Sequence, residues 1–600
     1  MARGERIPLA LVSVAAVPLV MRAAARFGLS ASVGATIVVL SVFHGGYAPA
    51  AWGWTALLAF WISILALSFR SALVVDRGGV ALLGGFAAVA GWTALSTTWT
   101  QSVPRTMLEL ERDLIYVAVA TAVLLLCRSE DRSQLVWGLC AGLVVVAALA
   151  VALYLASTPE VDATQGYLLF RPVGYANALG GLLVLALPLL VAFAAHDPRP
   201  AMAAVARASV VVSAVALYLT QNRAGYIALG VAFVVWISRT DAPARAFAAT
   251  LALTILVGTA LTAIKLLDLF NTNRQIADLG ARRIGAGVIV AAAAALVPAL
   301  ATRLPRRGVP GVRVARRAQI GAVVAAACAG IAFCIALFGS GSRAQYWRVA
   351  WHTFEKHLLL GTGAGTFDEQ WLRYRGSGLS VQDAHNLYLE TLSELGVVGL
   401  LLLVAVLALP IVVSRRTRDP LTTACLASYC AFLVHAAFEW DWEMPVVTVS
   451  GLVLASVLVR SGTGGAGFAL RGVARVAGIA AAAVVAAFAV AALVGNTDVV
   501  AAERQIARGD LLAATAQANR ARQLLPWSSE PWLVIADVRA RSSDQAGSRV
   551  ALREAIARDA SDWALWFRLA AASHGSERAV ALRRAVALDP RVFSGVGSGP

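Results

Sequence analysis

Charged residues are scarce in this chain, and the shortage decides its class. They make up 14% of the 600 residues, whereas hydrophobic residues make up 59%. Soluble globular domains carry about 25% charged residues and an apolar share nearer one half. The composition therefore excludes a soluble globular protein. It predicts a polytopic membrane protein of the all-α class, built as a bundle of transmembrane helices.

The sequence also lacks the spacings that mark disulfide, metal or nucleotide sites. Its six cysteines fall inside or at the ends of apolar runs, and none belongs to a CxxC or Cys/His pattern. The glycine-rich stretch at 361–365 lacks the Gly-Lys-Ser/Thr ending of a phosphate-binding loop and follows no predicted strand. We therefore predict small core cysteines, a tight turn at 361–365, and neither a metal ion nor a cofactor.

Long apolar runs are abundant. A membrane-spanning helix needs about 20 apolar residues, and fifteen runs approach this length, which predicts about 15 spans. A shorter run at 7–21 contains proline and is interpreted as interfacial or re-entrant; no signal-peptide cleavage motif follows it. The predicted spans lie near residues 29–44, 51–69, 79–97, 113–127, 134–156, 174–195, 207–221, 225–238, 246–266, 283–301, 318–339, 395–413, 420–438, 445–460 and 473–494.

Arginine supplies almost all of the net charge of +17, and it collects in alternate loops. Because cytoplasmic loops are enriched in Lys and Arg, these loops and the N-terminus are predicted to be cytoplasmic. The richest cluster, at 303–317, is interpreted as an anchor near anionic lipid, with a nucleic-acid or regulatory patch as the alternative. The predicted cytoplasmic loops are 70–77, 128–132, 199–207, 239–245, 303–317, 415–418 and 460–475. The polar segments that then share the outer face are 98–112, 157–173, 221–224, 267–282, 340–394 and 436–444.

The last hundred residues differ in composition and contain a repeat. The stretch 526–536 recurs 34 residues later as 560–570. This period resembles the tetratricopeptide repeat, whose stacked helix pairs leave a concave face for protein partners. The predicted domains are an N-terminal interfacial segment (1–28), a transmembrane bundle (29–339), an external loop with short helices (340–394), C-terminal transmembrane helices (395–495), a tetratricopeptide-like domain (498–593) and a disordered tail (594–600).

Arginines on the predicted outer face are candidates for binding an anion. Arg223 sits in the shortest break between two spans, and Arg171 immediately precedes a span. Arg343 and Arg348 begin a predicted amphipathic helix. A charge at membrane depth costs about 2.5 to 3.5 kcal/mol, and the planar guanidinium fork matches phosphate oxygens. We predict a pyrophosphate site; the alternatives are a snorkelling role for Arg223 and a solvated face for Arg348.

His385 is the candidate general base. It precedes a span and is flanked by Gln382, Asp383 and Asn386, of which Asp383 or Asn386 would orient the ring. An imidazole with a pKa near 6.5 accepts a proton from a hydroxyl near neutral pH. A lone histidine is more often structural, so that alternative stays open.

Three carboxylates and two tryptophans lie together in the segment 438–443. Trp440 and Trp442 are candidates for stacking against a sugar, with a hydrated span end and its aromatic belt as the alternative. Acid/base or cation binding by the carboxylates is less favoured. His352 and His357 have no acidic partner at a metal-ligand spacing and are interpreted as structural.

Four stretches together resemble the O-antigen ligase and O-antigen polymerase superfamily, which are GT-C-like membrane glycosyltransferases. They are RPVGYANALGGLL at 171–183, QNRAG at 221–225, RAQYWRVAWHTFEKHLLLGTGAGTF at 343–367 and HNLYLETLSELGVVGL at 385–400. The resemblance covers roughly residues 30 to 460. One departure is Asn222, where the family often carries serine before the arginine.

The resemblance implies a metal-independent, inverting glycan transfer on the outer face of the cytoplasmic (inner) membrane. The donor would be an undecaprenyl-pyrophosphate-linked glycan and the acceptor a hydroxyl of a glycan, lipid or protein. Arg223 and Arg343 would hold the donor pyrophosphate, and His385 would assist deprotonation of the acceptor. The product distinguishes a ligase from a polymerase, and the sequence does not.

Two other function classes remain open at the level of sequence. Charges at membrane depth also mark substrate paths in a transporter or flippase, although no inverted repeat is found between the halves. The membrane part is alternatively a scaffold that presents the tetratricopeptide-like domain to envelope proteins. No nucleic-acid partner is expected.

Overall fold

The chain is helical almost throughout. The computed structural model describes residues 16–70, 73–157, 161–197, 199–240, 255, 257–270, 276–303, 342–376, 378–462 and 467–591. Within these, the predicted all-α class is confirmed, with one short antiparallel pair formed by β1 (Val74–Asp76) and β2 (Gly467–Ala469). The helices of the membrane part are α1 (Ala16–Val42), α2 (Pro49–Phe69), α3 (Arg77–Ser96), α4 (Val103–Leu126), α5 (Arg132–Ala156), α6 (Ala176–His196), α7 (Pro200–Thr220), α8 (Arg223–Arg239), α10 (Ile276–Arg303), α12 (Ser342–Lys356), α13 (Phe367–Tyr374), α14 (Leu387–Ser414), α15 (Pro420–His435), α16 (Pro445–Ser461) and α17 (Gly472–Arg508).

Eight of the described helices are long and apolar enough to cross a membrane: α2, α3, α5, α6, α7, α10, α14 and α17. Four shorter apolar helices accompany them, namely Phe27–Val42, Val257–Leu266, α15 and α16. The chain is thus a multi-pass membrane protein, and the total of about 15 spans stays a prediction. The predicted span at 318–339, the arginine cluster at 304–317, the segment 1–15 and the tail at 594–600 lie outside the described residues.

Three helices extend past the boundaries that hydropathy predicts. The described part of the predicted interfacial segment, from Ala16, is continuous with α1. Helix α4 begins at Val103 rather than near 113, because Ser102 caps it and Pro104 stands in its first turn. The first turns of α4 carry ionisable residues that face other protein segments. These turns are therefore not apolar, and hydropathy alone does not identify them as part of the helix. Helix α17 continues to Arg508, past the predicted span end at 494.

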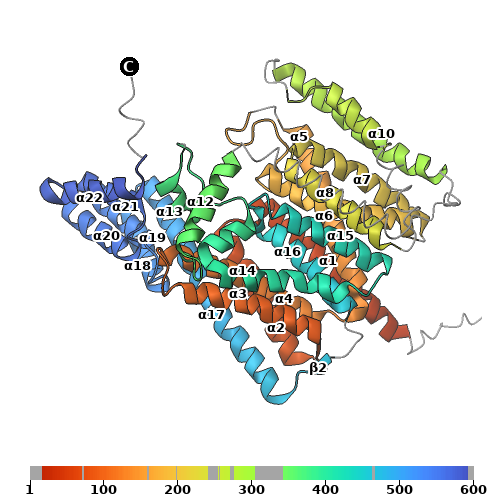
Figure 1. Ribbon diagram of the computed structural model, residues 1–600, viewed down its shortest axis with the longest axis horizontal. Helices are drawn as coiled ribbons and strands as arrows, with labels where there is room; N and C mark the ends of the chain where they lie inside the picture. The colour runs from red at the N-terminus through yellow and green to blue at the C-terminus, as the bar shows by residue number, and fades with distance from the viewer. Residues whose placement is uncertain are drawn as a thin grey trace, which may run out of the picture.

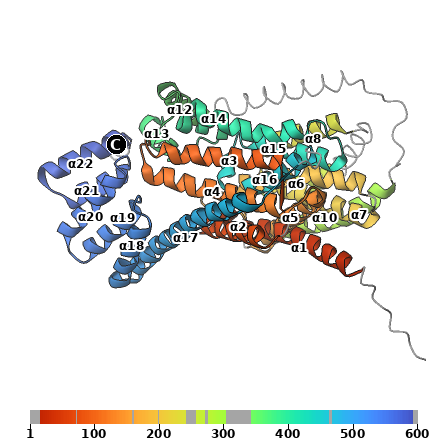
Figure 2. The same ribbon diagram turned by 90° about the horizontal axis from the view of Figure 1, so that it is seen from below.

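Helix α6 forms the centre of the bundle. It packs against α5, α7, α8 and α15, and 89% of its apolar window is buried. Its sequence consists mainly of small residues and leucines and contains no Asp, Glu, Lys or Arg. Neighbouring helices can therefore approach it closely from every side. Figures 1 and 2 show the surrounding helices running roughly along α6, with α10 beside α7 at the edge of the bundle.

The arginine-rich loops gather at one end of the bundle. Arg70 donates to the carbonyl oxygens of Leu125 and Leu126 at 2.7 and 2.9 Å. Arg460 donates to the carbonyl of Leu124 at 2.8 Å and faces Asp76 at 3.7 Å. These guanidinium groups satisfy carbonyls at helix C-termini, where cations are favoured by the helix dipole.

The segments predicted to be external meet at the opposite end, which we call the polar end. Tyr47 donates its hydroxyl to Gln382 at 3.1 Å, the amide of Gln101 donates to Thr362 at 3.1 Å, and the amide of Leu387 donates to Ala436 at 2.9 Å. The described parts of the two groups of loops therefore lie at opposite ends of the bundle. Which end faces the cytoplasm stays a prediction.

The C-terminal helices stack into a separate layer at the polar end (Figure 2). They are α18 (Leu511–Leu524), α19 (Glu530–Arg541), α20 (Gln545–Arg558), α21 (Trp563–Ala572) and α22 (Gly575–Leu588). Helices α18 and α20 begin 34 residues apart, the period seen in the sequence, and each helix packs on the next. The second half of α17 completes the first core of this layer. We call α18–α22 the repeat domain; its assignment as tetratricopeptide-like stays a prediction.

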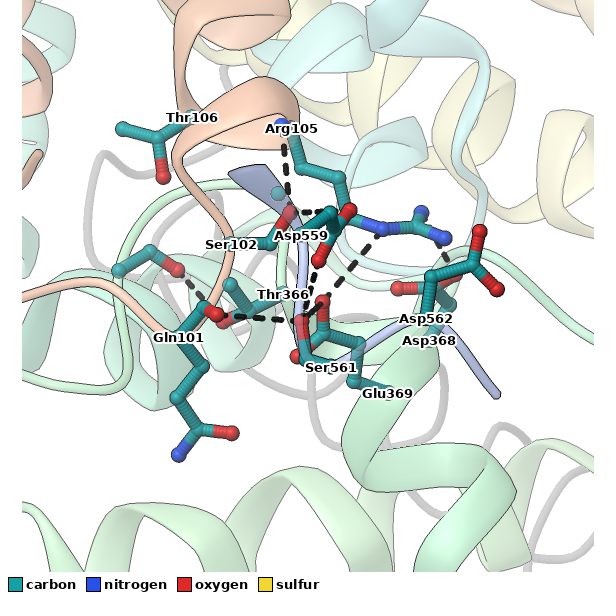
Figure 3. Close-up of polar contacts among 12 residues, drawn as sticks. Gln101, Ser102, Arg105, Thr106, Thr366, Asp368, Glu369, Asp559, Ser561 and Asp562 are labelled. Atoms are coloured by element: carbon teal, nitrogen blue, oxygen red, sulfur yellow. Dashed lines mark hydrogen bonds and ion pairs between the residues drawn. The ribbon is translucent and has the colours of Figure 1, made fainter. Parts of the chain in front are cut away.

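The repeat domain docks on the membrane part through a polar cluster (Figure 3). Ser561 lies 2.7 Å from Glu369 of α13 and 3.1 Å from the carbonyl of Gln101, while Ser102 donates to Asp559 at 2.9 Å. Arg105 of α4 pairs with Asp368 at 2.6 Å. A second contact joins Arg375, just after α13, to Asp589 by two hydrogen bonds of 2.7 and 2.9 Å.

This interface concentrates carboxyl groups around a single guanidinium. Burial raises the pKa of Glu369 to about 8 and that of Asp368 to about 6, although Arg105 opposes both shifts. Glu369 therefore keeps its proton at neutral pH and can donate it to Ser561, whose one hydroxyl proton cannot serve all three neighbouring oxygens.

Docking of the repeat domain is expected to weaken as the pH rises. In the docked state Glu369 binds its proton more tightly than an exposed glutamate does. The protonated Glu369 therefore contributes fully to the free energy of docking below the ordinary pKa of 4.5, and this contribution is lost by about pH 8. Hydrogen exchange of α13 and α22 measures docking. Protection should fall between pH 5 and 8 in the wild type and change less in Glu369→Gln. Equal pH dependence in both proteins would contradict this assignment.

Candidate active site

The external segment 342–386 lies on the polar end as a folded unit. Helix α12 packs on α14, and the turn after it binds the start of α14: the amide of Gly363 donates to the Glu394 carbonyl at 2.8 Å, and that of Gly365 donates to the Glu394 side chain at 2.9 Å. Gly361, Gly363 and Gly365 all have positive φ, which explains the glycine spacing. The predicted tight turn is present, and it serves to hold the segment on α14.

Arg343 is anchored at the centre of the site. It stands in the first turn of α12 and forms an ion pair with Glu439, whose side chain is 1% exposed. Glu439 also accepts hydrogen bonds from the Tyr175 hydroxyl at 3.1 Å and the Asn177 amide at 3.0 Å. Tyr175 stacks on Trp440, with ring centroids 5.0 Å apart. The stretch at 171–183 thus meets the start of α12 through one glutamate.

Arg223 is placed on the same network through its neighbour Asn222. Asn222 is fully buried and caps α8 by accepting from the Gly225 amide at 2.8 Å. Its own amide donates to the Asn177 carbonyl at 2.8 Å and lies 2.9 Å from His435 Nε2. Arg223, the first residue of α8, is exposed, and its side chain forms no hydrogen bond or ion pair with the described part of the chain. Its side chain is therefore available to an anion.

His385 lies before α14 in a conformation suited to proton acceptance. Its φ of 55° is in the left-handed region, which is uncommon for a residue other than glycine. Nδ1 lies 3.0 Å from the Asp383 carbonyl oxygen, which only accepts, so the proton is on Nδ1 and Nε2 keeps its lone pair. The ring contacts Tyr346, with centroids 5.3 Å apart. Burial, and then the charge of Arg343, lower the pKa of His385 to about 4, so the ring is neutral at pH 7.

A second polar cluster lies next to His385. Arg112 of α4 binds Glu443 at 2.8 Å and Glu109 at 3.1 Å, and it lies over the Trp52 ring. Carboxylate oxygens of Asp383, Glu390 and Glu443 lie within 4.8 Å of one another, a spacing that would suit a cation. Burial raises the pKa of Asp383 to about 7 and that of Glu443 well above its usual range. Arg112 supplies the positive charge that faces this cluster.

The other predicted site residues form no hydrogen bond with Glu439 or Asn222 that the structure describes. Arg171 is exposed and lies over Phe170, and Arg348 is exposed and donates to the carbonyl of Ala344 in its own helix. Gln382 accepts from Tyr47, and Asn386 caps α14 by accepting from two backbone amides. Asp383 belongs to the acidic cluster, and Trp440 lies between Tyr47 and Tyr175. The backbone carbonyl of Trp442 accepts a hydrogen bond from Tyr116. His352 on α12 and His357 just after it are exposed.

Sequence reasoning missed the residues that hold the arginines. Glu439 was noted only as one of three adjacent carboxylates, and His435 appeared to be part of an apolar span. Arg343 and Glu439 are 96 residues apart, so no local spacing reveals the pair. The available signal was the unusual density of carboxylates in 438–443.

A cavity of about 100 Å³ lies between α3, α4, α14, α15 and α16. Aliphatic and aromatic side chains form most of its wall, and Glu109, Asp113, Glu390 and Glu394 also line it. Neither Arg223, Arg343 nor His385 borders it. The candidate site is thus separate from the cavity, which shares Glu109 and Glu390 with the acidic cluster around Arg112.

The fold and the site define a multi-pass membrane protein with anchored arginines and a neutral histidine at one end of its bundle. The family model described as O-antigen ligase matches residues 208–404, about a third of the chain. This match supports the resemblance to the O-antigen ligase superfamily over that segment, and the family suggests an enzyme that transfers glycans. No curated protein matches the chain.

Chelation is expected to leave glycan transfer unchanged, because the Arg112 guanidinium already pairs with Glu443 in the cluster of Asp383, Glu390 and Glu443. The measurement is the transfer rate of purified protein with EDTA, and then with added Mg²⁺ or Mn²⁺. If a cation increases the transfer rate of the wild type, and Glu390→Gln abolishes this increase, the cluster is a metal site instead.

Proposed function

We propose that this protein transfers a glycan from a polyprenyl-pyrophosphate carrier, of the undecaprenyl type, to an acceptor hydroxyl at the outer face of the cytoplasmic membrane. The observation that carries the proposal is the convergence of four distant stretches at the polar end. Residues 171–183, 221–225, 343–367 and 385–400 contribute to one buried hydrogen-bonded network and to the histidine beside it. The family match supports the reaction class.

The arginines would stabilise the leaving group. The acceptor oxygen attacks the anomeric carbon as the bond from that carbon to the pyrophosphate oxygen breaks, and the electron pair of that bond passes to the pyrophosphate. Two guanidinium groups, from Arg223 and Arg343, would bind the charge that develops there. Attack from the face opposite the leaving group inverts the anomeric centre. Arg343 would exchange part of its contact with Glu439 for the donor.

His385 would accept the proton of the acceptor hydroxyl at Nε2, since Nδ1 is committed to the Asp383 carbonyl. The lowered pKa keeps the ring neutral and also makes it a weak base, so proton transfer would accompany bond formation to the anomeric carbon rather than precede it. The Tyr47 and Tyr175 rings, which both contact Trp440, offer with it an aromatic surface for a sugar.

Substitution of the three central residues tests the proposal. Arg223→Ala, Arg343→Ala and His385→Ala are each expected to reduce transfer by about a hundredfold or more, because each removes charge stabilisation or proton acceptance. Matched controls are Arg418→Ala at the opposite end and His352→Ala on α12, which should retain activity. The assay uses purified protein and a polyprenyl-pyrophosphate glycan; a single larger product indicates a ligase and a ladder a polymerase. Wild-type rates in all three variants would refute the assignment.

The pH dependence of transfer provides a second test. Because the pKa of His385 is lowered to about 4, the acidic limb of kcat/KM should lie well below 6.5. The measurement is best made in Asp383→Asn, which removes a carboxyl whose pKa burial raises to about 7 but leaves its backbone carbonyl. An acidic limb near 6.5 in that variant would place the base in a solvated setting, against the structure.

A further inference from the structure

The amide of Asn222 is fixed by three partners. Its oxygen accepts from the Gly225 amide, and its nitrogen donates to the Asn177 carbonyl and toward His435 Nε2. Because the two backbone partners differ in kind, the amide cannot be reversed without losing both hydrogen bonds. Asn222 thus does more than cap α8, which serine would also do.

The orientation of Asn222 determines the state of His435. A nitrogen that receives the Asn222 amide proton carries no proton itself, so the imidazole proton is on Nδ1, which faces Asp441 at 3.3 Å. The side chains of His435 and Asp441 are 2% and 1% exposed. Three side chains from a turn, a helix end and a connecting segment therefore lie in a row, which we call the chain: Asn222 contacts His435, and His435 faces the Asp441 carboxylate.

Two glycines of α6 make room for this chain. A Cβ atom at Gly180 would lie 2.4 Å from Asn222 Nδ2, and one at Gly181 would lie 2.8 Å from Asp441 Oδ2 and 3.0 Å from His435 Cε1. Any larger residue at either position would displace a member of the chain, since real Cβ contacts are not found below 3.0 Å. The Gly-Gly pair in the stretch 171–183 thus has a structural purpose at this site.

We propose that Asn222, His435 and Asp441 are positioning residues that hold Arg223, in register with Arg343, for the donor pyrophosphate. Asn222 directly precedes Arg223, and through the Asn177 backbone it joins the residue whose side chain binds Glu439, the partner of Arg343. A shift of Asn222 therefore moves one arginine relative to the other. This inference rests on the proposed function of the two arginines.

Asn222→Ser separates the capping role from the positioning role. Serine still caps α8 but does not span the distance to both Asn177 and His435. The affinity of purified protein for a polyprenyl pyrophosphate is expected to fall roughly tenfold, which corresponds to the net contribution of one buried hydrogen bond. The KM for the donor should rise while the KM for the acceptor and the amount of folded protein stay unchanged. The matched control is Asn496→Ser, which removes an amide bonded to Glu111 on the neighbouring α4.

Substitutions of His435 supply the second arm. His435→Gln keeps an acceptor for the Asn222 amide and should retain most donor affinity, whereas His435→Ala should match Asn222→Ser. Unchanged donor affinity in both Asn222→Ser and His435→Ala would overturn the inference, as would failure of the wild type to bind the pyrophosphate. If the wild type binds the pyrophosphate, and the variants bind it more weakly, yet no glycan is transferred, the proposed function fails and the positioning role stands.

Discussion

The ion pair between Arg343 and Glu439 is the interaction on which the rest of the site depends. Glu439 is buried, and a buried carboxylate is stable only when charge and hydrogen bonds compensate it. It therefore collects Arg343, Tyr175 and Asn177, which come from separate parts of the chain. These contacts compensate the free-energy cost of burying the Glu439 charge, and they also fix the position of Arg343. An exposed pair of flexible side chains would not fix this geometry.

The general plan of the chain could be predicted from its sequence, and the site only in part. Hydropathy located the helices that became α5, α6 and α14, and the arginine pattern separated the loops into the two groups that lie at opposite ends. Both properties are local. The beginning of α4 was not predictable in this way, because Arg112 and Glu109 resemble loop residues until their buried partners are known.

The stretches that resemble the O-antigen ligases led to Arg223, Arg343 and His385, but the residues that hold them could not be found from spacing. Glu439 and His435 act through contacts with residues far away in the sequence. Asn222 seemed to be a departure from the family pattern, and its three hydrogen bonds now give it a defined role. Long-range partners are decided by packing, which a single sequence does not display.

The docked repeat domain brings the C-terminal region into the same structural unit. Helix α13 contacts the repeat domain through Glu369, while Trp371 of α13 packs edge-on against Tyr346, whose ring meets His385. The external segment is thus held between the bundle and the repeat domain. This arrangement favours a structural contribution of the repeat domain to the site over a role only in recruiting partners.

The most direct test of this account is a structure of the protein with a polyprenyl pyrophosphate bound. The account predicts that the pyrophosphate lies between Arg223 and Arg343, within hydrogen-bond distance of both guanidinium groups and beside His385. A pyrophosphate bound instead at the arginine-rich end, or one that contacts neither arginine, would contradict it.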